Sequence, residues 1–398
     1  MDIIDKLRVF QREYLKKIKN RHYKRYLYKE INFNSKLFSI VGARGVGKTT
    51  LLLQYLRESP FNFSQKLYVS VDILGAWSLF DIAFEFHRRG GKLIIFDEIH
   101  KYDGFEKELK NIYDMLDLKV VFSGSSALKL DFSKGDLSRR ATVYNMQGLS
   151  FREFLEMKHK ISLQKITLQN ILENHIDLAD ELLLEFNLYS DWNEYLKYGY
   201  YPFYFENKEE YHIKLASTIN AVIESDIPSI FPIEYSNIIL LKKLIFLICS
   251  SNPYKPNMKN LLDKMNLKND YNRLYRYMFY LYKGKIINLA GAKSRGDGIL
   301  SKPEKIYLNN TNLHYAYCDN PEIGTIREVF FYSMLFNHKV LIPKKGDFLV
   351  DDKFTFEIGG KNKTKKQIKG IENSYTVLDD IEIGGERKIP LWLFGFLY

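Results

Sequence analysis

Four side chains in two short segments have the types and spacing that phosphate chemistry requires. Lys48 and Thr49 end residues 42–49, which read G-x-x-x-x-G-K-T, and Asp97 and Glu98 follow an apolar run farther along the chain. In such a loop the lysine reaches the β and γ phosphates and the threonine hydroxyl holds Mg²⁺. Asp97 adds a second Mg²⁺ ligand, and Glu98 adds a base that orients and deprotonates a water. Together they predict binding and hydrolysis of ATP with Mg²⁺.

The nucleotide-binding prediction covers the whole loop and the residue after it. Its glycines let the backbone adopt left-handed conformations and approach a ligand closely. The helix that follows would direct its N-terminal N–H groups at the phosphates. The predicted nucleotide-binding residues are Gly42, Ala43, Arg44, Gly45, Val46, Gly47, Lys48, Thr49 and Thr50. The alternative is a glycine turn that carries a lysine by chance, and the complete motif between a strand and a helix argues against it.

The surrounding pattern predicts the elements that position these residues. Apolar residues at 37–41 predict a strand before the loop, and an amphipathic segment after the loop predicts a helix. Residues 66–72 and 92–98 read as further strands, with a helix over 77–88 between them. The continuous apolar run before the paired acids is typical of a central parallel strand that is covered on both faces. Ligands bind at the carboxyl ends of such strands, which is where the acids lie.

A further strand, over 120–126, ends in small polar residues. In ATPases that carry the base on the strand of the paired acids, a hydroxyl at this strand end lies beside the γ-phosphate. Ser123 and Ser125 are equal candidates for that position. Downstream, Arg139 and Arg140 precede a Leu-Ser-Phe segment.

The order of these motifs resembles that of AAA-type ATPases of bacteria and archaea with a C-terminal domain of the DUF4143 or archaeal-ATPase kind. The matching segments are residues 42–52, 96–100, 123–126 and 149–155. The resemblance implies an α/β fold, an AAA-like P-loop NTPase with a parallel sheet flanked by helices. It also implies that Arg140 stabilises charge on the γ-phosphate from the same or a neighbouring subunit. Arg139 replaces the usual glycine, so either arginine remains a candidate, an exposed arginine pair is the alternative, and a homo-oligomer stays open.

The pattern divides the chain into five parts. We expect basic helices at 1–29, the ATPase domain at 30–160, a helical lid at 161–255, a winged helix-turn-helix at 256–310 and a small restriction-endonuclease-like α/β domain at 311–398. The winged helix rests on two short amphipathic helices followed by a hairpin. Its second helix offers Arg273 and Arg276, with Lys268 near its start, for contact with DNA. Packing of this module against protein is an equal alternative.

Residues 323–398 resemble the PD-(D/E)xK nuclease core, in which a helix Glu, a strand Asp, a second acid and a Lys gather around Mg²⁺. The corresponding residues are Glu328, Asp347, Glu357 and Lys361. Lys361 stands four residues after Glu357 instead of two, which in a regular strand separates them by about 13 Å rather than about 7 Å. We therefore expect a relative that does not cleave DNA but whose lysines can hold a phosphate backbone. The alternatives are an ATP-gated, Mg²⁺-dependent nuclease and a nucleotide switch or scaffold without turnover.

Composition and cysteine content indicate the number of domains, the kind of partner and the cellular compartment. A chain of 398 residues exceeds one compact core, and its net charge of +11 suits a polyanionic partner such as DNA. Cys249 and Cys318 lack zinc-ligand spacing, so we expect free or buried thiols in a reducing compartment. The longest apolar run, 238–249, contains two lysines and falls short of the ~20 residues of a membrane span. We expect a cytoplasmic protein with no membrane partner.

Overall fold

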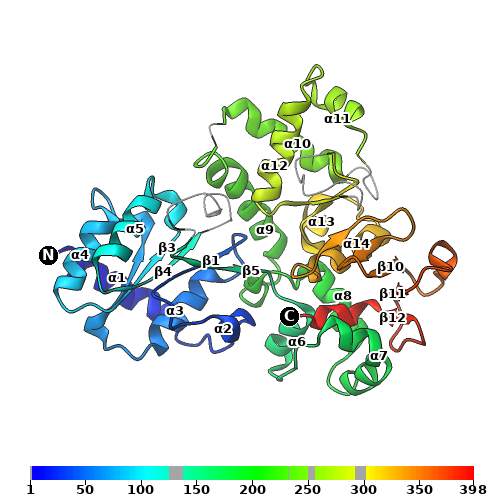
Figure 1. The fold of residues 1–398 in the computed structure, drawn as a ribbon, viewed down its shortest axis with the longest axis horizontal. Coiled ribbons are helices and arrows are strands. Elements are labelled where there is room, and N and C mark those ends of the chain that lie inside the picture. The colour runs from blue at the N-terminus through cyan, green and yellow to red at the C-terminus, as the bar shows by residue number, and fades with distance from the viewer. Residues whose placement is uncertain (1, 125–136, 138, 232, 250–255, 292–301) are drawn as a thin grey trace. The chain divides into compact units, whose positions relative to one another are not determined.

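The computed structural model describes residues 2–124, 137, 139–231, 233–249, 256–291 and 302–398 (Figure 1). The chain divides into two compact units. The first unit comprises Met1–Gly148 with Ser225–Pro232, and the second comprises Leu149–Glu224 with Ile233–Tyr398. The five-part division expected from the sequence is finer than this and stays a prediction.

A five-stranded parallel sheet in the order β2-β3-β4-β1-β5 forms the centre of the first unit. The strands are β1 (Leu37–Gly42), β2 (Lys66–Ser70), β3 (Leu93–Asp97), β4 (Lys119–Gly124) and β5 (Thr142–Met146). The expected parallel sheet is confirmed, and the strand before the paired acids lies between two neighbours, as its apolar run indicated. The edge strand β5 was not predicted, because most of its residues are partly exposed and form no continuous apolar run.

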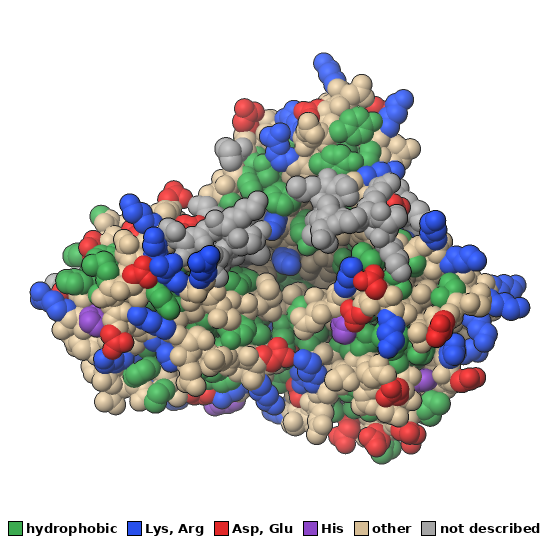
Figure 2. Space-filling model, in the orientation of Figure 1, with side chains coloured by type: hydrophobic (Ala, Val, Ile, Leu, Met, Phe, Trp, Pro, Cys, Tyr) green, Lys and Arg blue, Asp and Glu red, His purple; other side chains and the backbone are tan. Residues whose placement is uncertain are grey.

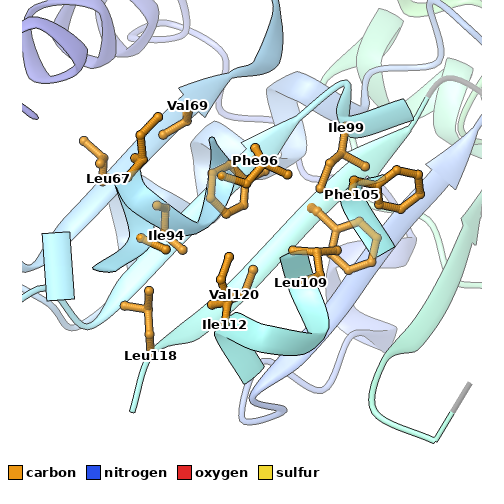
Figure 3. Close-up of a cluster of buried hydrophobic side chains, with 14 of the residues drawn as sticks. Leu67, Val69, Ile94, Phe96, Ile99, Phe105, Leu109, Ile112, Leu118 and Val120 are labelled. Carbon is orange, nitrogen blue, oxygen red and sulfur yellow. The ribbon is translucent and has the colours of Figure 1, made fainter. Parts of the chain in front are cut away.

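Helices cover the sheet and close the core. They are α1 (Ile3–Lys17), α2 (Leu27–Glu30), α3 (Lys48–Glu58), α4 (Leu79–Arg88) and α5 (Phe105–Met115). Figure 3 shows side chains of α5, β2, β3 and β4 that belong to one buried hydrophobic cluster. The expected basic N-terminal helix buries Ile4, Leu7 and Gln11, and the Gln11 amide oxygen accepts a hydrogen bond from the backbone N–H of Tyr68 at 2.8 Å. Helix α1 is therefore an integral part of the first unit.

The second unit begins with a helical region. Its helices are α6 (Phe151–His159), α7 (Leu168–Leu182), α8 (Leu188–Tyr198), α9 (Tyr211–Ala221) and α10 (Tyr235–Cys249). Ser150 and Glu153 form a reciprocal capping box at the start of α6. The Ser150 hydroxyl and the Arg152 Nε also donate to the backbone oxygen of Tyr398, at 2.8 and 3.0 Å. The Leu-Ser-Phe segment thus anchors the carboxyl end of the chain.

Two helices and a strand pair follow where the sequence predicted them. They are α11 (Met258–Met265), α12 (Tyr271–Lys283), β6 (Ile287–Ala290) and β7 (Lys305–Leu308), and the two strands pair antiparallel. The polar tip expected at 293–297 lies outside the described residues. The assignment of these elements as a winged helix stays a prediction.

The carboxyl-terminal part contains two helices and a second five-stranded sheet, ordered β12-β11-β10-β9-β8. Its elements are α13 (Thr311–Tyr317), α14 (Ile323–Met334), β8 (Val340–Leu341), β9 (Phe348–Val350), β10 (Phe354–Gly359), β11 (Ser374–Leu378), β12 (Lys388–Pro390) and the 3₁₀ helix η8 (Leu391–Phe396). Residues 391–398 are all buried, as expected for so apolar an end. The restriction-endonuclease likeness of this part stays a prediction.

The two cysteines correct one expectation. Cys249 at the end of α10 and Cys318 after α13 form a disulfide with a Cα–Cα distance of 5.1 Å. The prediction of free thiols was wrong, because the 69-residue separation gives no spacing signal and only the fold brings the two side chains together. Among the described residues, no helix is both long and apolar enough to cross a membrane.

Candidate nucleotide site

The loop between β1 and α3 uses its glycines for two different reasons. Gly45 and Gly47 have positive φ angles of 85° and 101°, which residues with a side chain rarely adopt. Gly42 instead allows close packing, because a Cβ at this position would lie 2.3 Å from the backbone oxygen of Met146 in β5. The loop therefore turns tightly into α3, and its first glycine lets the edge strand approach.

Lys48 begins helix α3 and is almost completely buried, with 4% of its surface exposed. Its Nζ donates to the backbone oxygens of Gly42 and Ala43 at 3.1 and 3.0 Å. Burial lowers the pKa of Lys48, and the nearby carboxylates of Glu98 and Asp97 oppose that change. Among the described residues, the amine thus bonds to backbone oxygens of the loop that carries it, and a phosphate can replace them.

Asp97 connects the loop to the centre of the sheet. It ends β3, is 2% exposed, and its Oδ2 accepts from the Thr49 hydroxyl at 2.7 Å and from the Tyr68 hydroxyl at 2.6 Å. Its Oδ1 accepts from the Ser123 hydroxyl at the end of β4. The structure therefore brings together the loop threonine, the first acid and Ser123.

Glu98 follows with a left-handed backbone conformation, φ 60° and ψ 37°. Such a conformation is unfavourable for a residue with a side chain, and it persists where the surrounding structure fixes it. The backbone N–H of Glu98 donates to the Ser123 hydroxyl at 3.1 Å, and its Oε2 lies 3.7 Å from His100 Nε2. Burial raises the pKa of Glu98, while Lys48 opposes the rise. A carboxylate with a raised pKa is a better proton acceptor in general base chemistry.

Three residues of this region were missed by the sequence analysis. Tyr68 gave no signal because it reads as an ordinary strand residue. Arg25 gave no signal because it is one of many basic residues in the N-terminal segment of the sequence. Its guanidinium is buried and donates to the backbone oxygens of Val46, Gln147 and Gly148. It thereby connects the phosphate loop to the segment after β5.

Asp226 is the third missed residue. Its Oδ1 lies 2.9 Å from Nη1 of Arg44, which is one of the variable positions of the loop motif. No motif marks Asp226, which stands far from the loop in the sequence.

Other predicted residues lie elsewhere or outside the described part. Arg140 forms a two-point ion pair with Asp114 of α5, at 2.9 and 3.0 Å, and Arg139 is exposed. The prediction that one of them reaches the γ-phosphate is therefore untested. Ser125 lies outside the described residues, so only Ser123 can be placed.

The nuclease-like residues pair with lysines. Lys363 Nζ lies 2.6 Å from Glu357 Oε1, and Lys305 Nζ lies 2.7 Å from Glu328 Oε2 and 3.6 Å from Asp347 Oδ1. Burial raises the pKa of Glu357, which the bond from Lys363 opposes. Lys361, in contrast, is exposed. The described residues contain no group of three or more His, Cys, Asp or Glu side chains placed to hold a metal ion.

The residues predicted to contact DNA differ in their availability. Arg273 donates from Nε to the Tyr277 hydroxyl at 2.6 Å and from Nη2 to the Asn237 side-chain oxygen. Lys268 and Arg276 are exposed. Arg273 thus fixes local packing, and two of the three side chains face solvent.

A family model and a relative match this chain. Residues 34–155 match the family model described as an AAA domain. Over 394 residues the chain is 26% identical to an uncharacterized protein of Methanocaldococcus jannaschii, covering 90% of this chain and 82% of that protein.

Solved structures give more distant similarities. The AMPPCP-bound DnaA from Aquifex aeolicus is 14% identical with a TM-score of 0.25, over 71% of this chain and 90% of that chain. The S. cerevisiae Hsp104-ADP complex is 15% identical with a TM-score of 0.27, over 69% of this chain and 38% of that one. C. elegans PCH-2 is 16% identical with a TM-score of 0.23, over 40% of this chain and 45% of that one. The chain thus spans less than half the length of the last two. The family match and the loop on its parallel sheet support a nucleotide-binding AAA domain in residues 34–155.

Proposed function

We propose that the chain hydrolyses ATP with Mg²⁺ at the loop between β1 and α3. The observation that carries this proposal is the contact of the Thr49 hydroxyl with Asp97 at 2.7 Å, beside the buried Lys48 and the half-buried Glu98. A hydroxyl and a carboxylate are the two protein oxygens with which P-loop enzymes hold Mg²⁺, and waters and phosphate oxygens complete the shell. The donor set therefore fits this ion.

Each residue has a distinct role in the proposed reaction. Thr49 and Asp97 would hold Mg²⁺, and the bound ion would neutralise negative charge on the phosphate oxygens. Lys48 exchanges its two backbone acceptors for phosphate oxygens and neutralises their charge. Glu98 orients a water for in-line attack on the γ-phosphate and accepts its proton, with ADP as the leaving group. The Ser123 hydroxyl donates to the Asp97 carboxylate and accepts from the backbone N–H of Glu98, so it fixes the positions of the two acids relative to each other.

Phosphate release tests this proposal. We expect turnover in the unmodified chain, loss of ATP binding in Lys48→Ala, and retained binding with turnover reduced by about 10² or more in Glu98→Gln. Millimolar ATP at micromolar affinity should raise the free energy of unfolding by about 4 kcal/mol. An unfolding transition that does not respond to ATP and Mg²⁺ would refute ATP binding. If ATP binds but Glu98→Gln and the unmodified chain are equally slow, the nucleotide-switch alternative replaces hydrolysis.

A DNA-associated task is the second element of the proposal, and it is supported by a lysine-rich surface of the second unit. The surface comprises the exposed side chains of Lys344, Lys345, Lys361, Lys365, Lys366 and Lys369. A Cβ at Gly346 would lie 3.1 Å from Ile368, so the turn before β9 packs against the 3₁₀ helix η7 (Lys365–Ile368). Figure 2 shows Lys and Arg side chains gathered at the edge where Figure 1 draws this segment in orange. Such a surface attracts phosphate backbones through counterion release.

Salt dependence of DNA binding tests this surface. We expect the unmodified chain to bind a labelled duplex without sequence preference, and log Kd to rise with log salt with a slope of about 4 to 5. A Lys361→Ala, Lys365→Ala, Lys366→Ala, Lys369→Ala variant should weaken binding and flatten that slope. Removal of four exposed lysines of the first unit, Lys6, Lys16, Lys19 and Lys107, is the matched control. Equal losses in both variants would show a response to net charge alone.

An ATP-gated nuclease is the alternative, because Glu328, Asp347 and Glu357 share one region with two lysines. Plasmid incubated with protein and Mg²⁺ or Mn²⁺ decides between the two. Cleavage that is lost in Asp347→Ala would establish the nuclease, and intact plasmid under all conditions would exclude it.

A further inference from the structure

A carboxylate from outside the loop motif is buried beside the phosphate loop. Asp226 ends the π-helical turn η6 (Val222–Asp226) and belongs to the first compact unit, which contains the loop. Only 2% of its surface is exposed. Its Oδ1 lies 2.9 Å from Arg44 Nη1, whereas its Oδ2 is buried and has no hydrogen-bond partner among the described residues.

Burial of the Asp226 carboxylate destabilises the fold unless a cation neutralises its charge. A buried carboxylate oxygen without a partner loses its hydration, and an ion pair that loses one member leaves an uncompensated charge. Arg44 provides the compensating charge here, and more than a third of the Arg44 side chain is exposed. The buried acid thus depends on a residue of the phosphate loop.

The charge of Asp226 also acts on other residues of the loop and its base. It opposes the lowering of the Lys48 pKa by burial, and it adds to the rise in the Glu98 pKa that burial causes. Asp226 therefore lies close enough to the two residues that we assign to phosphate binding and water activation to interact with both. A polyphosphate bound by Lys48 would bring several further negative charges close to the Asp226 carboxylate. Water screens the repulsion between them poorly at this buried position.

We propose that Asp226 is a residue of the nucleotide site that competes with the polyphosphate for Arg44 and so reduces its affinity. This inference rests on the proposed function. One guanidinium pairs well with either a carboxylate or a phosphate in its planar fork. In this structure the carboxylate of Asp226 pairs with Arg44, and a bound polyphosphate would take its place.

The competition has a structural consequence for the segment that carries Asp226. Once Arg44 turns to the phosphates, the buried Asp226 carboxylate loses the ion pair that it forms among the described residues. Residues 225–231 must then open to water or gain a new partner, since an unpaired buried charge is destabilising. Nucleotide occupancy is thereby linked to the conformation of this segment.

Equilibrium binding of phosphate compounds tests the proposal. With ATP, ADP, AMP and inorganic tripolyphosphate as probes, Asp226→Asn should bind ATP roughly tenfold more tightly than the unmodified chain. The gain should be similar for tripolyphosphate, smaller for ADP and smallest for AMP, because repulsion and competition grow with phosphate charge. Asp226→Glu keeps the carboxylate and should restore the lower affinity. Asp2→Asn is the matched control, since it removes an ion pair with Arg89 that involves no residue of the loop.

The outcomes separate this inference from the proposed function. No ATP binding by the unmodified chain overturns both. Normal binding by the unmodified chain, with equal or weaker binding by Asp226→Asn, overturns this inference alone. Hydrogen exchange gives an independent readout that mere loss of stability would not reproduce. ATP should increase amide exchange in residues 225–231 of the unmodified chain and leave it unchanged in Asp226→Asn, and an ATP-induced increase of equal size in both would also overturn the inference.

Discussion

Tyr68 donates its phenolic hydrogen to Asp97 Oδ2 across 2.6 Å, from the strand next to the one that Asp97 ends. The same oxygen accepts from Thr49, and the other oxygen accepts from Ser123. Three hydroxyl groups on three elements therefore fix the orientation of one buried carboxylate. Burial and the charge of Asp97 raise the pKa of Tyr68, which keeps this donor protonated.

Replacing Tyr68 with phenylalanine should affect catalysis more than folding. The carboxylate keeps two of its hydroxyl donors but loses part of its orientation, so we expect ATP turnover to fall about tenfold. The Mg²⁺ concentration for half-maximal turnover should rise, while the free energy of unfolding falls by about 1 kcal/mol. Magnesium titration of turnover and urea unfolding measure these effects. Tyr55→Phe is the control, because the Tyr55 hydroxyl has no hydrogen bond among the described residues. A normal Mg²⁺ requirement in Tyr68→Phe would contradict the orienting role.

Replacing Arg25 with methionine should destabilise the first unit strongly. The variant retains an apolar stem but leaves the backbone oxygens of Val46, Gln147 and Gly148 without this donor. At about 1 kcal/mol or more for each unsatisfied buried acceptor, we expect a loss of about 3 kcal/mol. Urea unfolding measures it. Arg88→Met, which removes an exposed pair with Glu85, should change stability by less than about 0.5 kcal/mol. Equal effects in the two variants would show that Arg25 does not brace the loop.

His100 should make stability depend on pH below neutrality. Burial, Lys48 and Lys101 lower its pKa from 6.5 to about 3, so the folded chain keeps this imidazole neutral while the unfolded chain protonates it. The contribution of the neutral imidazole to the free energy of unfolding is complete above pH 6.5 and is lost progressively as the pH falls toward 3. At pH 5 the free energy of unfolding is lower by about 2 kcal/mol for this reason. His100→Gln should remove this part of the slope in urea unfolding between pH 7 and 5, and the exposed His22→Gln variant is the matched control. Identical slopes in the unmodified chain and His100→Gln would contradict the assignment.

The Cys249–Cys318 bond should stabilise the second unit. The cross-link closes a 69-residue separation, and the chain-entropy estimate for such a loop is about 4 kcal/mol. Reductant should therefore lower the free energy of unfolding of the unmodified chain. A Cys249→Ser, Cys318→Ser double variant should have the reduced stability with or without reductant. Thiol titration of the unfolded, unreduced chain that finds two free cysteines would disprove the bond.

The sequence predicted those parts of the molecule in which local pattern and structure coincide. The strand before the loop and the strand before Asp97 are buried on both faces, so their apolar runs stand out. The loop and the paired acids are recognised from residue type and spacing, and the structure places Thr49 in contact with Asp97. The partners of the site could not be found in this way. Arg25, Tyr68 and Asp226 reach it from distant segments, and no spacing rule relates them to the loop.

In the C-terminal sheet, a turn after β10 explains why residue spacing did not predict the lysine that pairs with Glu357. A regular strand through Glu357 would place Lys361 on the same face, but β10 ends at Gly359. The backbone then turns, with Lys363 N–H donating to the Gly360 oxygen at 2.8 Å. This turn brings Lys363 back to Glu357 and leaves Lys361 exposed. The sequence therefore indicated that a lysine lies near Glu357, but it did not indicate which lysine.

The contact between Gly42 and the Met146 backbone oxygen changes how loop variants are to be read. A Cβ at Gly42 would lie 2.3 Å from that oxygen, so even alanine must displace the edge strand. If a variant of this glycine loses activity, the cause is displacement of the edge strand rather than loss of a contact with the ligand. A mutational scan scored on activity alone would confuse the two, whereas one that also records expression level and melting temperature would separate Gly42 from Lys48.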